Sequence, residues 1–382
     1  MKSKDTGAGG NRGLLLPVSH LHGGATMLRS PSRVEIGYTV LISLAVLCCP
    51  YALAEAQLKL KLTGAFPPPE VSMMSEAVQH WENLITERTK GAITFENFWG
   101  CALGSPAEQV DLVKNGTAHL GNFHQWYTPT KMPLGDFEYA IPLGPTDYEL
   151  VVTAMRQIRG EFPAFTKELD DNNVVLIADL PFGVYNFMSK VPINSLDDFK
   201  GKKISLIGRY FGKWLPPGST AVVRPGQERY DLLRTGVVDI DLLPFDLLYA
   251  FKIHEVTKFY IRANLMTACG AVLVMNKDAF NALTPEQRKL FLDAGKEVEL
   301  WAARELLPKW HARCDAEWKK AGLTYVDISP EDKKKWADSI PDTALEWAKE
   351  VDAKGLPGSA IVKRWQEITS LLGYQWPHKW GE

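Results

Sequence analysis

The chain has 382 residues, of which 46% are hydrophobic and 23% are charged, and its formal net charge is −2. Nucleic-acid-binding proteins usually carry a strong basic excess, so this charge balance argues against that class. The length suggests about two domains of ordinary globular composition. The 12 tryptophans are enough to supply both a core and an aromatic ligand cleft.

The N-terminal region predicts export. Arg29 and Arg33 precede an uncharged run, 36–49, and Ala52 and Ala54 follow it as an A-x-A cleavage site. This order is typical of a secretory signal peptide, and the run is shorter than the ~20 apolar residues of a membrane span. We therefore expect cleavage near Ala54 and a periplasmic mature protein, with an uncleaved N-terminal anchor as the alternative. Whether residues 1–26 are translated is open, because a signal peptide would naturally begin at residue 27.

The mature region opens with alternating strands and helices. An alternating apolar pattern predicts a first strand, and apolar residues at three- and four-residue spacing predict the helix after it. A Ser-x-x-Glu capping box at Ser105 starts the second helix. The third strand runs into the aromatic loop 124–127. The expected strands are 58–66, 92–99 and 118–123, and the expected helices are 70–90 and 105–115.

The middle of the chain predicts a crossing into a second domain. Residues 131–146 are rich in Pro and Gly and predict irregular structure, and 147–158 predicts a helix. The apolar run 173–180 is typical of a buried strand of a parallel sheet. Pro181 to Gly183 interrupts it, and 184–188 resumes as the first strand beyond the crossing.

Residues 195–246 have the pattern of a βαβ-type half-domain. A short capped turn at 196–199 precedes strand 204–207, helix 228–235 and strand 237–243. The loop 208–214 follows a strand end, where open α/β sheets bind their ligands. A helix at 247–253 and a strand at 258–261 complete this segment.

The last part of the chain predicts a return strand and a long helix. Residues 271–276 are apolar, and we interpret them as the strand that returns to the first domain. A Thr cap followed by Pro starts a helix over 284–318, which Pro308 should kink. Two further helices follow, the first capped by Ser329 and the second beginning after 355–359.

The cysteines and the catalytic motifs give no sign of a metal or cofactor. Cys101, Cys269 and Cys314 fit no zinc or redox spacing, and they are interpreted either as one disulfide with a free thiol or as small core residues. No nucleophile elbow, P-loop or dinucleotide-binding glycine motif is present. Asp239 and Asp241 could hold a cation or act as a base. The alternative is a strand-end pair that meets backbone amides or Lys.

Several motifs together resemble the solute-binding proteins of tripartite ATP-independent periplasmic (TRAP) transporters of the dicarboxylate-binding type. They are SLDDFKGKKI (195–204), ERY (228–230), LRTGVVD (233–239), TKG (89–91), LG (103–104), VKNG (113–116), VMN (274–276) and LTPEQR (283–288). The resemblance covers most of the mature chain. It implies an α/β fold with two periplasmic-binding-protein-like lobes, crossing hinge strands and a long helix that spans both lobes.

The same resemblance implies a division of the chain and a set of partners. Residues 1–54 would be the N-terminal extension and signal peptide. Residues 55–182 would form lobe I, completed by about 270–310, and 183–269 would form lobe II, completed by about 311–382. The lobes would close on one small ligand and deliver it to the small and large membrane subunits of a permease, with no cofactor and no nucleic acid. The receptor would be a monomer or a dimer.

Three positions depart from the pattern that the resemblance implies. The family usually has an Arg directly after the Lys-Ile strand start, where it clamps the ligand carboxylate, but this chain has Ser205. A second Arg is replaced by Tyr185, and an amide or polar residue before a Pro is replaced by Leu243. We therefore expect an aromatic or otherwise atypical ligand rather than an ordinary dicarboxylate.

Arg209 is the favoured replacement clamp, with a solvent-facing Arg as the alternative and Arg224 as a second candidate. Aromatic residues at strand ends favour an aromatic or largely apolar ligand, or a cation held by ring faces, although some aromatic residues will belong to the core. The expected ligand-binding residues are Phe66, Glu70, His124, Trp126, Tyr127, Tyr185, Ser205, Arg209, Tyr210, Phe245 and Asp246.

Two other functions are weighed against transport. The first is a receptor on the same fold that feeds a sensor. The second is an exported enzyme that uses Asp239, Asp241 or Glu228.

Overall fold

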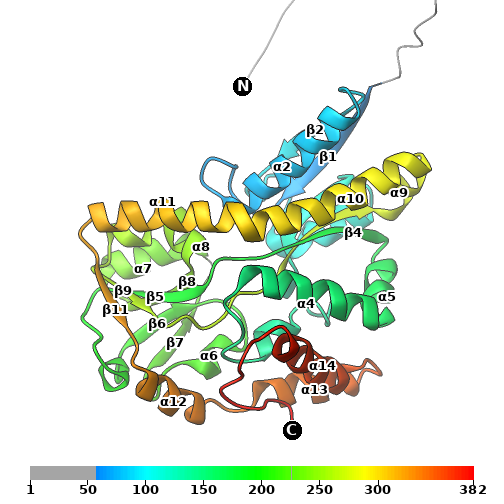
Figure 1. Ribbon diagram of the computed structural model, residues 1–382. Coiled ribbons are helices and arrows are strands. Elements are labelled where there is room, and N and C mark those ends of the chain that lie inside the picture. Colours follow the sequence, from blue (N-terminus) through cyan, green and yellow to red (C-terminus); the bar gives the residue numbers. More distant parts are fainter. Residues whose placement is uncertain (1–56, 225) are drawn as a thin grey trace, which may run out of the picture. The chain divides into compact units, whose positions relative to one another are not determined.

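The structure is a computed structural model that describes residues 57–382, apart from residue 225 and the side chain of Gln227 (Figure 1). The predicted signal peptide, its cleavage near Ala54 and the question of residues 1–26 lie outside the described residues. Two sheets with helices around them form the described part, which agrees with the α/β fold expected from the sequence.

The first sheet is mixed and begins with the N-terminal strands. It consists of β1 (Leu58–Gly64), β2 (Ile93–Phe98), β3 (Leu120–His124), β4 (Val174–Leu180) and β10 (Ala271–Asn276). Their order is β2-β1-β3-β10-β4. β1 runs parallel to β2 and β3, whereas β10 runs antiparallel to β3 and β4. The return strand expected at 271–276 therefore lies inside this sheet, between β3 and β4.

The second sheet is built from the middle of the chain. It consists of β5 (Tyr185–Ser189), β6 (Lys203–Leu206), β7 (Thr220–Val223), β8 (Ile240–Pro244), β9 (Phe259–Arg262) and β11 (Thr324–Asp327). Their order is β11-β9-β5-β8-β6-β7. We call the regions built around the first and second sheets the first and second lobes.

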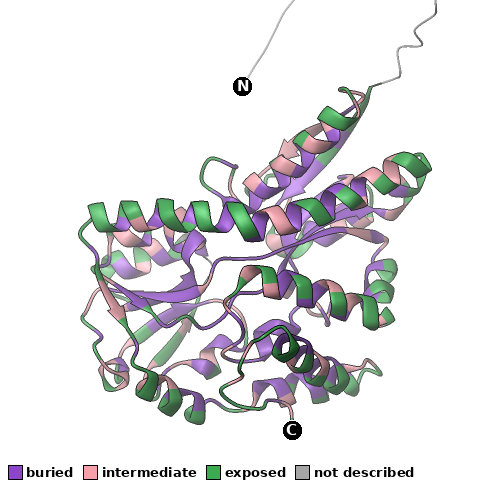
Figure 2. Ribbon diagram, in the orientation of Figure 1, coloured by how far each residue is buried: buried purple, intermediate pink, exposed green. Residues whose placement is uncertain are grey.

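The helices flank the two sheets. They are α2 (Met73–Arg88), α3 (Gln109–Lys114), α4 (Tyr148–Glu161), α5 (Pro163–Asp171), α6 (Phe211–Trp214), α7 (Arg229–Thr235), α8 (Phe245–Ala250), α9 (Lys277–Ala282), α10 (Pro285–Trp301), α11 (Leu307–Lys320), α12 (Pro330–Ser339), α13 (Thr343–Asp352) and α14 (Gly358–Leu371). Figure 2 shows buried strands inside both lobes and exposed residues along the outer side of α11. In the described part, no helix is long and apolar enough to cross a membrane.

Short 3₁₀ turns connect several of these elements. They are η1 (Pro106–Glu108), η2 (Gln125–Tyr127), η3 (Phe137–Ala140), η4 (Leu196–Phe199), η5 (Gly226–Glu228) and η6 (Ile253–Glu255). The region 131–146, expected to be irregular, contains η3 alone as regular structure.

Two extended segments cross between the lobes side by side. Residues 181–184 lead from β4 to β5, and 263–270 lead from β9 back to β10. The Phe182 N–H donates to the Ala268 carbonyl at 2.9 Å, and the Tyr185 N–H donates to the Met266 carbonyl at 2.9 Å. These bonds hold the crossing segments together, so the connection between the sheets is a two-stranded ribbon rather than two loose loops.

The long helix provides a third connection between the lobes. Thr284 caps α10 and Pro285 occupies its first turn, as the sequence predicts. A π-helical turn, η7 (Ala302–Leu306), joins α10 to α11, and the helix changes direction there (Figure 1). Pro308 has no N–H to donate to the preceding turn, so this part of the helix cannot keep regular α-helical bonding.

Buried tryptophans attach the C-terminal helices to both lobes. The Trp214 indole donates to Thr343 Oγ1 at 2.8 Å, and the Trp336 indole donates to the Trp214 carbonyl at 2.6 Å. Thr343 Oγ1 in turn donates to the Ala140 carbonyl at 2.7 Å. Much of the high tryptophan content therefore serves the core rather than a ligand cleft.

Several elements and one bonding state differ from the sequence expectations. α5, α6, α9, β7 and β11 were not expected, and the helix expected after Ser329 is divided into α12 and α13. α5 is short and directly follows α4, and β7 is a mostly exposed edge strand without an alternating pattern. All three described cysteines are free thiols: Cys269 and Cys314 are buried, and Cys101 is partly buried. They are therefore small interior residues rather than a disulfide pair.

Gly183 gives the first test of the crossing ribbon. A Cβ atom there would lie 2.4 Å from the Phe245 ring and 2.7 Å from Asp246 Oδ1, closer than any relaxed contact. We expect Gly183→Ala to lower the free energy of unfolding by about 1–3 kcal/mol in urea titrations. The matched control is Gly160→Ala in α4, where a Cβ would meet open space. Equal stabilities of the two variants would contradict this packing.

Asp246 gives a second test, because it lies against the same ribbon. Its Oδ1 accepts the Gly183 N–H at 3.1 Å, and burial raises the pKa of this carboxyl from 3.8 to about 7. A carboxyl with a raised folded-state pKa binds more protons when folded, so its contribution to stability falls as pH rises between these values. Asp246→Asn keeps the acceptor and removes the titration. We expect its stability relative to wild type to rise by up to about 1.4 kcal/mol per pH unit from about pH 4 to 7, whereas a pH-independent difference would refute this assignment.

Candidate functional site

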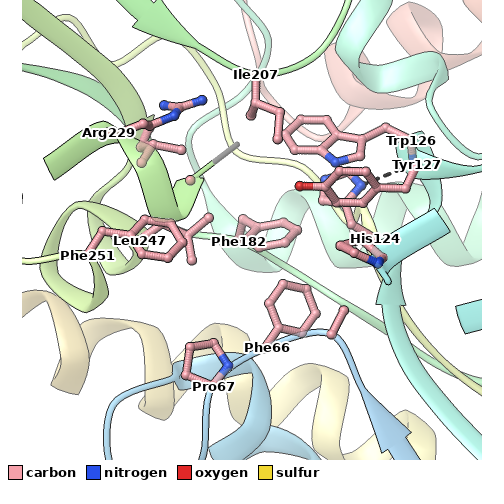
Figure 3. Close-up of a pocket in the computed structure, with 14 residues that line it drawn as sticks. Phe66, Pro67, His124, Trp126, Tyr127, Phe182, Ile207, Arg229, Leu247 and Phe251 are labelled. Carbon is pink, nitrogen blue, oxygen red and sulfur yellow. Dashed lines mark hydrogen bonds between the residues drawn. The ribbon is translucent and has the colours of Figure 1, made fainter. Parts of the chain in front are cut away.

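A cavity lies where the strand ends of the two lobes meet (Figure 3). The first lobe contributes the loops that follow β1 and β3, and the second lobe contributes residues of β8, α7, α8 and the end of β6. Ligand sites of open α/β sheets lie at such carboxyl ends of strands. The lining residues are Ala65, Phe66, Pro67, Pro106, His124, Trp126, Tyr127, Phe182, Ile207, Gly226, Arg229, Leu243, Leu247 and Phe251.

Stacked rings form the wall that the first lobe and the ribbon provide. The His124 and Trp126 rings are nearly parallel, with centroids 3.6 Å apart, and the Phe182 ring stacks on His124 at 5.0 Å. Phe66 meets Phe182 edge to face at 5.8 Å. The Tyr127 hydroxyl points into the enclosed space (Figure 3). This wall suits a flat or apolar ligand, which can pack against ring faces.

His124 is a neutral member of this wall. The Trp126 backbone N–H donates to its Nδ1 at 3.2 Å, so the ring proton lies on Nε2, which is 3.0 Å from the Tyr139 hydroxyl. Burial lowers the pKa of His124 well below its usual value. His124 therefore presents an uncharged ring to the cavity.

Arg229 supplies a buried positive charge on the opposite wall (Figure 3). Its side chain and that of Asp241 are both fully buried, and Arg229 Nη1 donates to Asp241 Oδ1 at 2.8 Å. The Ser205 hydroxyl donates to the same oxygen at 2.5 Å. Nη1 also donates to the Leu242 carbonyl at 3.0 Å, and Nε donates to the Arg224 carbonyl at 3.3 Å. These bonds fix the guanidinium plane.

Some buried polar atoms around the cavity have no hydrogen-bond partner. Arg229 Nη2 and the Trp126 indole nitrogen are two such donors, and both residues line the cavity. The Tyr185 hydroxyl and Asp241 Oδ2 are also unpartnered, although neither residue lines it. Buried polar groups are nearly always bonded in folded proteins, so free donors at a cavity wall indicate a place for a ligand acceptor. Both unpartnered groups on lining residues are N–H donors, and one belongs to a charged guanidinium, so they favour an anionic ligand.

Several expected ligand residues lie at the cavity, and others do not. Phe66, His124, Trp126 and Tyr127 line it, as the strand-end argument predicts. Tyr185, Ser205, Phe245 and Asp246 are buried but lie outside the lining, and Glu70 is exposed. The reasons are local: Ser205 is engaged by Asp241, while Phe245 and Asp246 pack against Gly183.

Arg209 does not reach this cavity, so the structure does not support the replacement clamp expected at this position. Its guanidinium forms an ion pair with Glu350 of α13 and lies 4.6 Å from the centre of the Tyr210 ring. Arg209 and Tyr210 line a separate cavity with Asp136 and Phe211. The second candidate, Arg224, is exposed and lies 3.9 Å from Glu228.

Arg229 is the functional residue that the sequence reasoning missed. It was interpreted only as part of a helix and of a family motif. The available signal was its spacing, because Arg229 lies one helical turn before the apolar Leu233, so the two side chains share a face of the same helix. Both side chains are fully buried in the structure. Position 205 lacks an arginine, yet Ser205 and Arg229 meet at the same oxygen of Asp241.

The groups proposed for catalysis are separated from the cavity. Asp239 Oδ2 accepts the Lys203 N–H at 2.9 Å, which is the strand-end arrangement weighed as the alternative. Asp241 is engaged by Arg229, and Glu228 is exposed. Among the described residues, no group of three or more His, Cys, Asp or Glu side chains is arranged to hold a metal ion.

Comparison with known proteins identifies the family. Residues 65–350 match the family model of bacterial extracellular solute-binding proteins, family 7. A solute-binding protein of Albidiferax ferrireducens is 27% identical over 311 residues, which cover 79% of this chain and 90% of the relative.

Two solved structures share the fold. A TRAP solute-binding protein of Rhodoferax ferrireducens with copurified benzoate has a TM-score of 0.73 at 22% identity, covering 82% of this chain and 98% of the other. One from a Sulfitobacter species with bound β-D-galacturonate has a TM-score of 0.67 at 21% identity, covering 81% and 99%. The two-lobed fold implied by the sequence motifs is therefore confirmed.

The family match covers most of the chain and includes the strand-end loops, the crossing ribbon and the arginine that together form the cavity. The chain therefore belongs to family 7 of the bacterial extracellular solute-binding proteins.

Proposed function

We propose that this protein is a TRAP-transport receptor whose solute is a small organic acid with an aromatic or apolar body and one carboxylate. The observation that carries the proposal is Arg229 Nη2, a buried donor without a partner at the wall of an otherwise aromatic and apolar cavity. A carboxylate oxygen would satisfy this donor and gain a charge-assisted hydrogen bond.

The cavity walls set the character of the rest of the ligand. Phe66, Trp126 and Phe182 offer ring faces or edges from the first lobe and the ribbon, and Leu247 and Phe251 offer apolar surface from the second lobe. Burying apolar ligand surface is worth roughly 25 cal/mol per Å². An aromatic ring between these walls would contribute binding energy that a polar chain of the same length would not.

The charges at the cavity argue against a dicarboxylate. Arg229 is the one Lys or Arg among the cavity-lining residues that the structure describes, and His124 is neutral. A second buried carboxylate would have no cationic partner, and burying an unpaired charge is costly. The matched structures support one carboxylate, since benzoate and galacturonate each carry one.

The transport cycle would follow from the two-lobed arrangement. We propose that the lobes move about the crossing ribbon and close over the solute, which both lobes would contact. The mature receptor would act in the periplasm after cleavage near Ala54 and would deliver its solute to the small and large permease subunits. The transport role is favoured over a sensor receptor because the matched solved structures are TRAP receptors. The enzyme alternative loses support because Asp239, Asp241 and Glu228 lie outside the cavity lining.

A thermal-shift screen of the mature protein tests the ligand class. Benzoate should raise the melting temperature in a concentration-dependent way, because a ligand that binds only the folded state stabilises it by mass action. Succinate should give a much smaller shift. Arg229→Met should weaken benzoate binding by at least about 30-fold, the equivalent of about 2 kcal/mol for a charged hydrogen bond.

The matched control is Arg209→Met, which removes an arginine outside the cavity and should leave the benzoate affinity within about threefold of wild type, because it deletes no ligand contact. Loss of binding in Arg209→Met with retention in Arg229→Met would instead restore Arg209 as the clamp. A shift with succinate but none with benzoate would reject the aromatic-acid assignment.

A further inference from the structure

The Arg229–Asp241 pair is joined by one guanidinium nitrogen and one carboxylate oxygen, and the second terminal nitrogen and the second oxygen have no partner. Nη1 bonds Oδ1 at 2.8 Å, while Nη2 and Oδ2 are both buried and without a partner. Oδ1 already accepts two bonds, one from Arg229 and one from the Ser205 hydroxyl. The pair therefore retains one free donor for a ligand and one free acceptor oxygen at which a proton can bind.

Charge balance makes the free oxygen important. Without a ligand, the positive charge of Arg229 and the negative charge of Asp241 cancel between two fully buried side chains. A bound carboxylate adds a second negative charge against one positive charge. Because an uncompensated buried charge is strongly disfavoured, the closed complex becomes more stable when one of the two carboxylates takes up a proton.

His124 and Asp246 are poorer acceptors for that proton. Nδ1 of His124 accepts the Trp126 N–H, so protonation there would place two donors face to face, and Nε2 already carries the ring proton. Asp246 lies at the crossing ribbon, where its Oδ1 accepts the Gly183 N–H, and it makes no hydrogen bond with Arg229. Neither group is bonded to the arginine whose charge the ligand would share.

Asp241 has one charged group in contact with it. Arg229 of α7 pairs with it, and Ser205 of β6 does not titrate. Its cross-strand neighbour on β5 is the apolar Met188. The other titratable side chains on the flanking elements make no hydrogen bond with Asp241. Those that are not exposed are Tyr185 of β5, Tyr230 of α7, which donates to Glu255, and Tyr249 and Asp246 of α8. Those that are exposed are Lys203 of β6 and Glu228, Asp231 and Arg234 beside or within α7.

We propose that solute binding is coupled to proton uptake: as a carboxylate binds Arg229 Nη2, Asp241 takes one proton from solvent at Oδ2. This inference rests on the proposed function. One O–H bond forms on Asp241 and no other covalent bond changes. The receptor thereby captures a weak acid together with one proton, and the site remains electrically neutral.

The expected pH dependence follows from the competition for Arg229. Burial raises the pKa of Asp241, an effect that Arg229 and Ser205 oppose. A bound carboxylate shares Arg229 and repels Asp241, so the pKa of Asp241 is higher in the complex than in the free receptor. Between these two values, affinity falls by up to tenfold for each unit by which pH rises.

Calorimetric titration of the mature protein with benzoate measures this coupling directly. The observed enthalpy at one pH is compared in buffers of different ionisation enthalpy, and its slope gives the number of protons taken up. We expect uptake of up to one proton per benzoate in wild type, with an affinity that decreases as pH rises between the pKa of Asp241 in the free receptor and its higher pKa in the complex. The Asp241→Asn side chain presents an N–H where protonated Asp241 has its O–H. This variant should therefore take up no proton on binding benzoate. Its affinity for benzoate should be the same at pH 6, 7 and 8.

Asp246→Asn is the matched control, since it removes another buried carboxyl, outside the cavity, and should retain wild-type proton uptake. Benzoate binding without proton uptake would overturn this inference alone. So would proton uptake that persists in Asp241→Asn or disappears in Asp246→Asn. Absence of benzoate binding to wild type at every pH would overturn the carboxylate assignment as well.

Discussion

A buried arginine must be paired, and the pairing of Arg229 with Asp241 determines much of the second lobe. Arg229 begins α7, Asp241 lies within β8, and Ser205 of β6 bonds the same carboxylate oxygen. The three residues therefore fix the helix against two neighbouring strands. They also leave one guanidinium nitrogen without a partner on a residue that lines the cavity, and this is the nitrogen to which we propose that an anion binds.

The first lobe and the crossing ribbon supply the complementary surface. The rings of His124, Trp126 and Phe182 stack on one another. Burial keeps His124 uncharged, and the Trp126 N–H fixes its tautomer by donating to Nδ1. Two separate contributions to the binding free energy would then distinguish ligands at this cavity. One is the burial of apolar ligand surface against the neutral aromatic wall, and the other is one charge-assisted hydrogen bond to the buried arginine. Because the two features belong to different lobes, a ligand that satisfies both would favour the closed arrangement.

The sequence predicted the strand and helix pattern well, because that pattern depends on local signals. Capping residues such as Thr284 and the apolar runs of the buried strands act within a few residues, and the motifs identified the family. The strand-end loops containing Phe66 and His124 to Tyr127 meet at one cavity, because the carboxyl ends of strands meet at one edge of a sheet.

Local signals alone do not decide which arginine lies at the cavity. Arg209 lies in the loop that the sequence places nearest to the site, but Glu350, 141 residues later in the chain, draws it away. Arg229 is held inward by Asp241, and nothing near it in the sequence indicates that a strand carboxylate will reach it. The spacing to Leu233 places Arg229 on the inner face of α7, but the long-range charge pairs that direct the two arginines are visible only in the folded chain.

A crystal structure of the mature protein with benzoate would test the central claim most directly. The account predicts a benzoate carboxylate oxygen at about 3 Å from Arg229 Nη2, a typical length for a charged hydrogen bond, with the ring between Phe66, Trp126 and Phe182. It would be contradicted by a carboxylate bound to Arg209, or by an Arg229 guanidinium that makes no contact with the bound acid.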